Sequence, residues 1–267
     1  MNLKTPPKVL FFLLLIFASS ASFLWAKDDS PLDKYRKNYY SYRKVLEEFK
    51  LAREEYLKWK TLASRDSAVE KSQKLLSEVA EALSSYFSLL KASVESQSEF
   101  NPAVKELSLS LLNARLDFLS SFRSKILEID SLGRLEEESL ELEEDYKRGE
   151  LEADFVKSAL KMAKLGEVTS EVETLSLQVR QMVEEDKDYP QRERILGDWV
   201  FKISGKLELL RGSQNELWEK LVGFSSAEDY EKGKILTDVS EERVAVQGLV
   251  TEVVDHLLEI VRIPRYE

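Results

Sequence analysis

The sequence predicts an all-α protein: an elongated, up-and-down antiparallel helical bundle with coiled-coil-like packing and six or seven long helices. The chain of 267 residues holds only nine glycines and six prolines, and residues that favour helices dominate the rest. Apolar residues recur at alternating steps of three and four, which places them on one stripe of a helix. No run of alternating β-branched residues bounded by turn residues occurs in the sequence, so we predict no strand.

The stripes extend along most of the chain. The first comprises Tyr35, Asn38, Tyr42, Val45, Phe49, Ala52, Tyr56, Trp59 and Ala63. A second comprises Val69, Leu76, Val79, Leu83, Tyr86 and Leu90. A later one comprises Val200, Ile203, Leu207, Leu210, Gln214, Leu217, Leu221 and Phe224. Each stripe is of the kind that packs against neighbouring helices.

Turn and capping signals separate the stripes. Asn101 followed by Pro102 is a helix cap and first-turn pair. Residues 67–70 and 225–228 match the capping-box pattern. Further breaks are predicted at residues 130–133 and 188–190. The predicted helices therefore span residues 33–64, 67–99, 102–130, 134–187, 190–222 and 226–262.

A break near Gly149 or Gly166 within the fourth segment would give the seventh helix. Because the links are short, helices adjacent in sequence should be antiparallel neighbours. We expect three parts: residues 1–26, a three-helix segment over 27–130, and a three- or four-helix segment over 131–267.

The first 26 residues bear on the cellular location of the protein. Lys4 and Lys8 precede a stretch of 18 uncharged residues, 9–26, the pattern of a signal peptide cut after Ser20 or Ala26. A retained N-terminal membrane anchor is the alternative, since 18 residues are at the short end of what spans a bilayer. Both interpretations predict that the rest of the chain is translocated across the membrane, because the positive charges precede the apolar stretch. The body is expected to be extracytoplasmic: secreted, periplasmic, or on the outer face of the membrane.

The composition further narrows the range of possible functions. The formal net charge of −10 argues against nucleic acid as a partner. The chain contains no cysteine, which excludes a thiol nucleophile, disulfides and a cysteine-linked lipid anchor. The fold must therefore be stable from packing alone, and a chain of this length can bury enough apolar surface for that.

Residues 136–145 hold seven acids in ten positions. Such a run can ligate a hard cation, but acids on one helix point in many directions, and we interpret it as a solvated face. His256, the only histidine, has Glu252 and Glu259 about one turn away and is more simply an interface residue than a metal ligand. No metal or other cofactor is predicted.

Two Glu-Ser pairs, at residues 95–96 and 138–139, are the only remnant of a wall-cleaving transglycosylase pattern. Neither is accompanied by the glycine-rich loops that build a sugar cleft, and a catalytic carboxylate needs a shaped pocket. We therefore predict no catalytic residue and no enzyme. Gln214 interrupts an apolar stripe, and either fixes helix register or faces water.

The first predicted helix carries an unusual charge. Residues 33–65 contain ten Lys or Arg and five acids, although the whole chain is acidic. A candidate membrane or partner contact consists of Lys34, Arg36, Lys37, Tyr39, Tyr40, Arg43 and Lys44. Basic residues attract anionic head groups, and tyrosines suit that boundary. The alternative is intramolecular: the helix pairs with residues 134–188, where seventeen acids face eight basic residues.

These observations predict an exported, non-catalytic structural or protein-interaction bundle of the cell envelope. Its partners would be another protein, a second copy of itself, or an anionic membrane surface. The alternative function is an extracytoplasmic helical sensor or small-ligand-binding domain.

Overall fold

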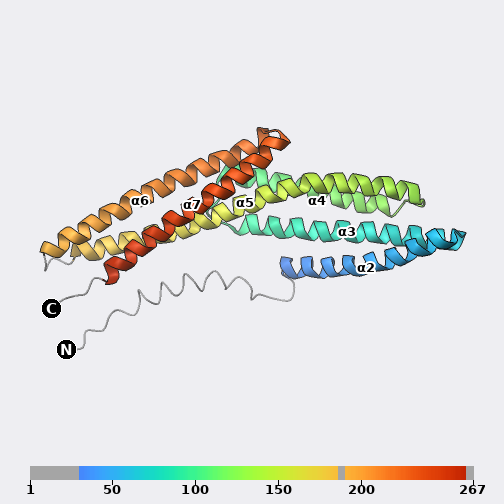
Figure 1. Ribbon diagram of the computed structural model, residues 1–267, viewed down its shortest axis with the longest axis horizontal. Helices are drawn as coiled ribbons and strands as arrows, with labels where there is room; N and C mark the ends of the chain where they lie inside the picture. The colour runs from blue at the N-terminus through green and yellow to red at the C-terminus, as the bar shows by residue number, and fades with distance from the viewer. Residues whose placement is uncertain (1–29, 186–189, 263–267) are drawn as a thin grey trace, which may run out of the picture.

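The computed structural model describes residues 30–185 and 190–262, which form an elongated helical bundle (Figure 1). Its helices are α2 (Pro31–Trp59), α3 (Leu62–Ser96), α4 (Pro102–Ile126), α5 (Leu132–Glu185), α6 (Pro190–Val222) and α7 (Asp229–Arg262), with a 3₁₀ turn, η2 (Gly223–Ser226), before α7. Consecutive helices pack against one another. The predicted all-α bundle is confirmed.

Helix α5 is the central helix of the molecule and the longest of its described helices. At about 1.5 Å per residue, its 54 residues extend about 80 Å. Helices α3 and α4 pack along one half of α5, and α6 and α7 along the other (Figure 1). Two bundles therefore share this helix, and residue 131 stands immediately before it.

The link between α3 and α4 is capped as predicted. The Asn101 side chain accepts hydrogen bonds from the backbone N–H groups of Ala103 and Val104, at 3.0 and 3.2 Å. Pro102 follows as the first helical residue, where its missing N–H costs nothing. The break predicted at residues 130–133 is also present, between α4 and α5. The one predicted at residues 188–190 lies almost wholly outside the described residues.

Both predicted capping boxes are wrong. Residue 67 lies inside α3, which begins at Leu62 after a capping box made by Thr61 and Ser64. Lys60, with φ of 48°, ends α2 in the left-handed conformation, and its N–H donates to the Tyr56 carbonyl. This earlier pair of hydroxyl caps satisfies the helix ends without Ser67.

Residues 225–228 also fail as a box. Ser225 lies in η2, and α7 starts only at Asp229, where the Glu228 N–H donates to the Glu231 carboxylate at 3.3 Å. The physical reason is Phe224, which is buried and stacks on Phe155 with 4.4 Å between ring centroids. This contact holds the turn against the bundle before the next helix begins.

Helix α5 is continuous through Gly149 and Gly166, so the bundle has no seventh helix in its described part. A Cβ at Gly149 would lie 3.2 Å from the Phe87 ring, and one at Gly166 would lie 3.2 Å from the Glu99 Cβ. Both glycines lie where α5 approaches its neighbours closely, rather than at breaks.

The apolar stripes form the core with one clear exception. In α6, the residues Ile203, Leu210, Leu217 and Leu221 are buried as the stripe predicted. In α2 only Val45 and Ala52 are buried, while Trp59 and Ala63 are exposed. The reason is that α2 ends at Trp59 and Ala63 already belongs to α3.

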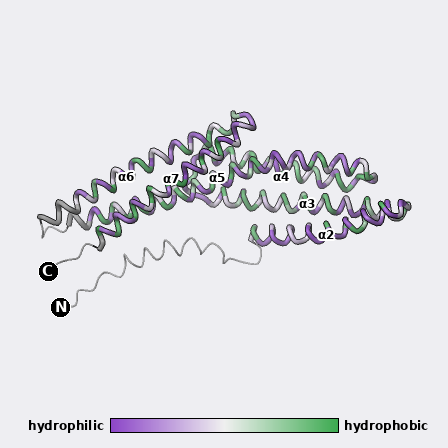
Figure 2. The backbone as a smooth tube through the Cα atoms, viewed as in Figure 1, coloured by the Kyte–Doolittle hydropathy of each residue, from purple (hydrophilic) through white to green (hydrophobic). Residues whose placement is uncertain are grey.

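Each described helix carries hydrophilic as well as hydrophobic residues along its length (Figure 2). Among residues 30–185 and 190–262, no helix is long and apolar enough to cross a membrane. The apolar stretch of residues 9–26 lies outside the described residues, so the choice between signal peptide and anchor stays a prediction.

Candidate contact helix and its two grooves

Helix α2 is the most weakly covered helix of the N-terminal bundle. Its principal neighbour is α3, whereas α3 also packs against α4 and α5. Because α2 rests on α3, a groove is left on each side of it. One lies between α2, α3 and α4, and the other between α2, α3 and α5.

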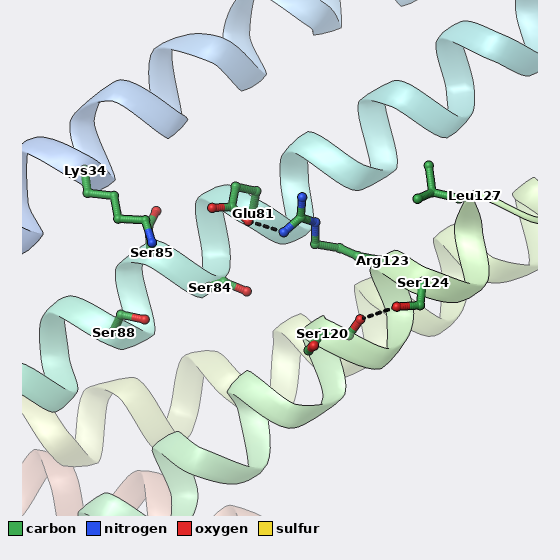
Figure 3. Close-up of a pocket in the computed structure, with 9 residues that line it drawn as sticks. All are labelled: Lys34, Glu81, Ser84, Ser85, Ser88, Ser120, Arg123, Ser124 and Leu127. Atoms are coloured by element: carbon green, nitrogen blue, oxygen red, sulfur yellow. Dashed lines mark hydrogen bonds and ion pairs between the residues drawn. The ribbon is translucent and has the colours of Figure 1, made fainter.

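The first groove, here named the serine groove, encloses about 380 Å³. Its lining consists of Lys34, Glu81, Ser84, Ser85, Ser88, Ser120, Arg123, Ser124 and Leu127. Figure 3 shows serines of α3 and α4 on the walls, with Lys34 of α2 extending toward Ser85. Eight of the nine lining residues are therefore polar.

A polar tie joins the three helices at this groove. Glu81 of α3 accepts a hydrogen bond from the Asn38 amide at 3.2 Å, and its other oxygen accepts from Nη1 of Arg123 (Figure 3). The Arg123 Nε–H is buried and has no acceptor among the described residues. Both oxygens of Glu81 are thus engaged, while the guanidinium keeps unused donors.

The second groove, here named the tyrosine groove, encloses about 610 Å³. Its aromatic lining consists of Tyr35, Tyr39, Tyr42, Tyr86, Phe87 and Tyr146, and its charged lining of Glu143, Glu150 and Lys157.

The rings of the tyrosine groove support one another. Tyr35 lies 5.6 Å from Tyr86 and 6.2 Å from Tyr39, centroid to centroid. Burial raises the pKa of the Tyr86 phenol, which lies beside the Lys157 ammonium group. An apolar aromatic wall with a few charged groups is typical of a small-molecule site.

The structure divides the seven residues of the predicted contact into three groups. Lys34 lines the serine groove and Tyr39 the tyrosine groove. All seven are exposed, and the other five line neither groove: Arg36, Lys37, Tyr40, Arg43 and Lys44. We call these five residues the basic face. Arg36, Tyr40 and Arg43 lie on the side of α2 opposite its buried Val45, and Lys37 and Lys44 lie on one flank of that side.

The basic face is not neutralised by the acidic part of α5. Within the described residues, the acids of α5 that pair with another helix do so with α4 and α6, through Lys125, Arg115 and Arg211. Arg36 lies 3.7 Å from Asp33 of its own helix, with both side chains more than half exposed. The intramolecular pairing considered from the sequence is thus absent from the described part of the chain.

The interpretation of residues 136–145 as a solvated face is only partly right. Glu138 and Asp145 are buried, because α4 places a cation opposite each. Lys125 lies 2.6 Å from Glu138. Arg115 contacts Asp145 and also donates to Glu152, at 2.7 and 2.9 Å.

One of these buried carboxyls, Asp145, has a shifted pKa. Burial raises the pKa of the Asp145 carboxyl, and the neighbouring Arg115 guanidinium opposes that rise. Such perturbed carboxyls can mark active sites. Here the ion pairs join α4 to α5, so the arrangement serves packing.

The residues weighed for chemistry occupy structural positions. His256 of α7 packs edge-on against Trp199 of α6, with 4.9 Å between ring centroids. In residues 30–185 and 190–262, no three His, Asp or Glu side chains gather as a metal site would require. Of the Glu-Ser pairs, Glu138 is held by Lys125, while Glu95 and Ser96 end α3 in solvent.

Gln214 contacts protein rather than only water. Its amide donates to the Thr169 hydroxyl at 2.7 Å, and Thr169 donates to the Leu165 carbonyl at 2.9 Å. Since Thr169 belongs to α5, the bond fixes one position of α6 along α5. This supports the register interpretation.

Neither groove was predicted from the sequence, because each combines residues from three helices. One signal was available for the serine groove. Ser84 and Ser88 are four residues apart, as are Ser120 and Ser124, so each pair lies on one face of its helix. The aromatic lining was assigned to the core, and only the fold shows that it borders open space.

No family model, curated protein or solved structure matches this chain.

Proposed function

We propose that this protein is an exported, non-catalytic interaction bundle of the cell envelope that contacts an anionic membrane surface through the basic face. The observation that supports this proposal most is the exposed set of cations on α2, for which the fold supplies almost no acidic partner. In contrast, the cations of α4 that lie against α5 are paired with its carboxylates.

The expected strength follows from the charges. Each Lys or Arg near an anionic bilayer contributes about 1 kcal/mol, so the four cations together favour contact by roughly 4 kcal/mol. Tyr40, which is 70% exposed, has an amphipathic ring that suits the head-group layer. The net charge of −10 repels the same surface, so contact requires that α2 face the membrane.

Export is part of the proposal and rests on the sequence. A basic start and an apolar run followed by acids are expected to carry the body across the membrane. If residues 1–26 are retained as an anchor, α2 begins close to the bilayer. If they are removed, the basic face becomes the main source of membrane affinity.

The test is co-sedimentation of residues 27–267 with vesicles that contain anionic lipid, at low ionic strength. Changing Arg36, Lys37, Arg43 and Lys44 to Gln should abolish most binding. The control changes four exposed cations of other helices, Lys161, Lys164, Lys202 and Lys234, and should leave most binding intact although it removes the same charge. Binding should also weaken with salt.

Two outcomes would contradict the membrane contact. If the unchanged protein does not bind, the basic face meets another partner, such as an acidic protein or a second copy. If both variants lose binding equally, only net charge matters and the position of the cations does not.

The tyrosine groove supports a second candidate function, the binding of a small ligand. Its volume of about 610 Å³ falls within the range of small-molecule pockets, about 300–1,000 Å³. A ligand that occupies it should raise the melting temperature, and Tyr146→Ala should remove that rise. Tyr230→Ala is the matched control, since Tyr230 is exposed on α7.

A further inference from the structure

The serine groove has a hydroxyl content that packing does not require. Five of its nine lining residues are serines, contributed by α3 and α4. Only Leu127 is a large apolar residue, and it is itself exposed. The groove is therefore built to meet polar groups.

Three of the five serine hydroxyls are free to donate a hydrogen bond to a ligand. Ser85 donates to the Ala82 carbonyl at 2.8 Å, and Ser124 to the Ser120 carbonyl at 3.3 Å. In the described part of the chain, Ser84, Ser88 and Ser120 donate to no protein atom. Since a hydroxyl carries one donor, these three can each donate to an acceptor in the groove (Figure 3).

The serine groove keeps a net positive charge after the Glu81–Arg123 ion pair is subtracted. Glu81 is bound by Arg123 and Asn38, so its charge is compensated. Lys34 forms no ion pair within residues 30–185 and 190–262. One cation is thus left over, and Arg123 retains N–H groups beyond the one that binds Glu81.

We propose that the serine groove binds a phosphate-type oxyanion, either free or as the phosphate of an ester. Lys34 and Arg123 supply the charge, and the hydroxyls of Ser84, Ser88 and Ser120 donate to the oxygens. Donors from three helices surround the space, which suits a tetrahedral anion with several acceptors. Hydrogen bonds that join ionised partners are the strong ones.

The volume bears on the form of the ligand. At about 30 Å³ for each water, the 380 Å³ of the groove corresponds to roughly a dozen waters. A phosphate group occupies only part of that space, so the groove also has room for an attached alcohol. A purely apolar ligand would leave these hydroxyls without partners, and a cation would be repelled by Lys34.

This proposal does not depend on the membrane contact. Lys34 lines the groove, whereas the cations of the basic face do not. The two proposals can therefore fail separately, and a pair of neighbouring lysines distinguishes them. Lys34→Gln changes the groove, and Lys37→Gln, three residues later, changes the basic face.

The experiment measures the thermal stability and titration calorimetry of the full chain with inorganic phosphate, against chloride at equal ionic strength. Phosphate should stabilise the unchanged protein. Lys34→Gln should weaken phosphate binding by about tenfold, the effect of losing one charge-assisted bond. Ser88→Ala should weaken it less, and Lys37→Gln should leave it unchanged.

A second arm identifies the source of the phosphate. Glycerol 3-phosphate tests a soluble ester, and vesicles of phosphatidylcholine with phosphatidic acid test a lipid head group. With glycerol 3-phosphate, loss of binding in Lys34→Gln but not in Lys37→Gln supports the groove and a soluble ligand. On the anionic vesicles Lys37 also contributes through the basic face, so weaker binding by Ser88→Ala, which changes no charge, is the result that supports a lipid head group.

The proposal is wrong if no probe binds better than chloride, or if the two lysine variants weaken the binding of inorganic phosphate equally. Circular dichroism verifies that Lys34→Gln is folded, and Ser88→Ala provides an independent test that keeps every charge. Arg123 is left unchanged, because its loss would also break the tie to Glu81.

Discussion

The two bundles that share α5 are packed by different means. In the C-terminal bundle, α6 buries Ile203, Leu210 and Leu217, and α7 buries Val239, Val246, Val253 and Ile260, large residues at seven-residue spacing. In the N-terminal bundle, α3 buries Ala68, Ser72, Ala80, Ala82 and Ser85 as well as larger residues. Helix α3 has three helical neighbours, α2, α4 and α5. Small side chains let several helices approach one helix closely, whereas the seams of larger residues serve α6 and α7, which pack mainly on each other and on α5.

Polar contacts between helices follow the same division. The N-terminal bundle holds buried or half-buried ties: Arg115 with Asp145 and Glu152, Arg123 with Glu81, and the Gln73 amide donating to the Ile129 carbonyl. In the described part of the C-terminal bundle, pairs such as Lys220 with Glu242 and Arg211 with Glu173 lie closer to solvent. The first bundle should therefore be the more sensitive to loss of a single polar group.

Among the polar contacts, Arg115→Met should give the largest effect. The Arg115 and Asp145 side chains are only 15% and 6% exposed, and breaking a buried pair leaves uncompensated charge at a cost of about 3–5 kcal/mol. Because Arg115 retains some contact with solvent, we expect a loss of about 3 kcal/mol in the free energy of unfolding, measured with urea. Arg211→Met, which removes a side chain that is 65% exposed and paired with Glu173, should cost less than about 1 kcal/mol. Equal losses would show that the two bundles do not differ in this way.

The pH dependence of the Arg115→Met variant follows from Asp145. Burial already raises the pKa of this carboxyl in the folded protein, and Arg115 opposes the rise. Without Arg115 the folded-state pKa rises further. Between the unfolded and folded pKa values the folded state binds more protons, so stability falls as pH rises through that window. The deficit of the variant should therefore shrink at mildly acidic pH, where the carboxyl is neutral.

Ala80→Leu tests the small-residue core of α3. Ala80 is fully buried, and added methylene groups in a tight core cost about 1–3 kcal/mol. Ala245→Leu is the control, since Ala245 is exposed on α7 and should change stability by no more than about 0.5 kcal/mol. If the α3 variant is as stable as the original protein, α3 is not the closely packed centre of its bundle.

The contrast between the bundles also explains what the sequence could predict. The stripe that includes Ile203, Leu210 and Leu217 predicted the α6 core, because large apolar residues at fixed spacing have one simple interpretation. The stripe from Val69 to Leu90 identified the helix but missed Ala80 and Ser85, whose small side chains carry no hydrophobic signal. Burial of Glu138 and Asp145 was equally hidden, since it depends on cations of another helix.

The candidate sites show the same limit. The sequence identified the charge of the first helix and predicted seven contact residues there, because a local excess of cations is visible in one segment. It could not separate Lys34 from Lys37, since only the position of α4 makes Lys34 part of a groove. A groove formed by α2, α3 and α4 depends on residues about 90 positions apart, and no periodicity within a helix encodes that.

Gln214→Leu should have a small effect on stability, less than about 1 kcal/mol, because Leu fits an apolar stripe. The Thr169 hydroxyl keeps its bond to the Leu165 carbonyl and stays satisfied. What should change is the register of α6, seen as faster amide hydrogen exchange in that helix. Thr169→Val leaves the Gln214 amide only its longer bond to the Leu165 carbonyl, at 3.5 Å, and should cost about 1 kcal/mol. A large loss in Gln214→Leu alone would mean that the two bonds of this amide stabilise the fold more than the packing of a leucine.

The smallest effect on stability is expected at the tip of the α2–α3 hairpin, and it contrasts with the α6–α7 turn. There, Phe224 is 2% exposed and stacks on Phe155, so that Phe224→Ala should cost about 3–5 kcal/mol. At the other tip, Trp59 is 62% exposed, with Leu57 and Leu62 exposed beside it. The Lys58 ammonium group lies over its ring, 4.8 Å from the ring centroid.

Because the Trp59 ring buries little surface, Trp59→Ala should change the free energy of unfolding by no more than about 0.5 kcal/mol. Exposed tryptophan beside lysine suits a membrane interface, so the same substitution should matter once the protein is on anionic vesicles. Subtracting the emission spectrum of Trp59→Phe from that of the original protein gives the Trp59 emission, which should shift to shorter wavelengths when vesicles are added. A loss above about 1 kcal/mol in solution would show instead that this tip is packed like the α6–α7 turn. An unshifted emission with bound vesicles would restrict membrane contact to the basic face, because the tip would then remain in water.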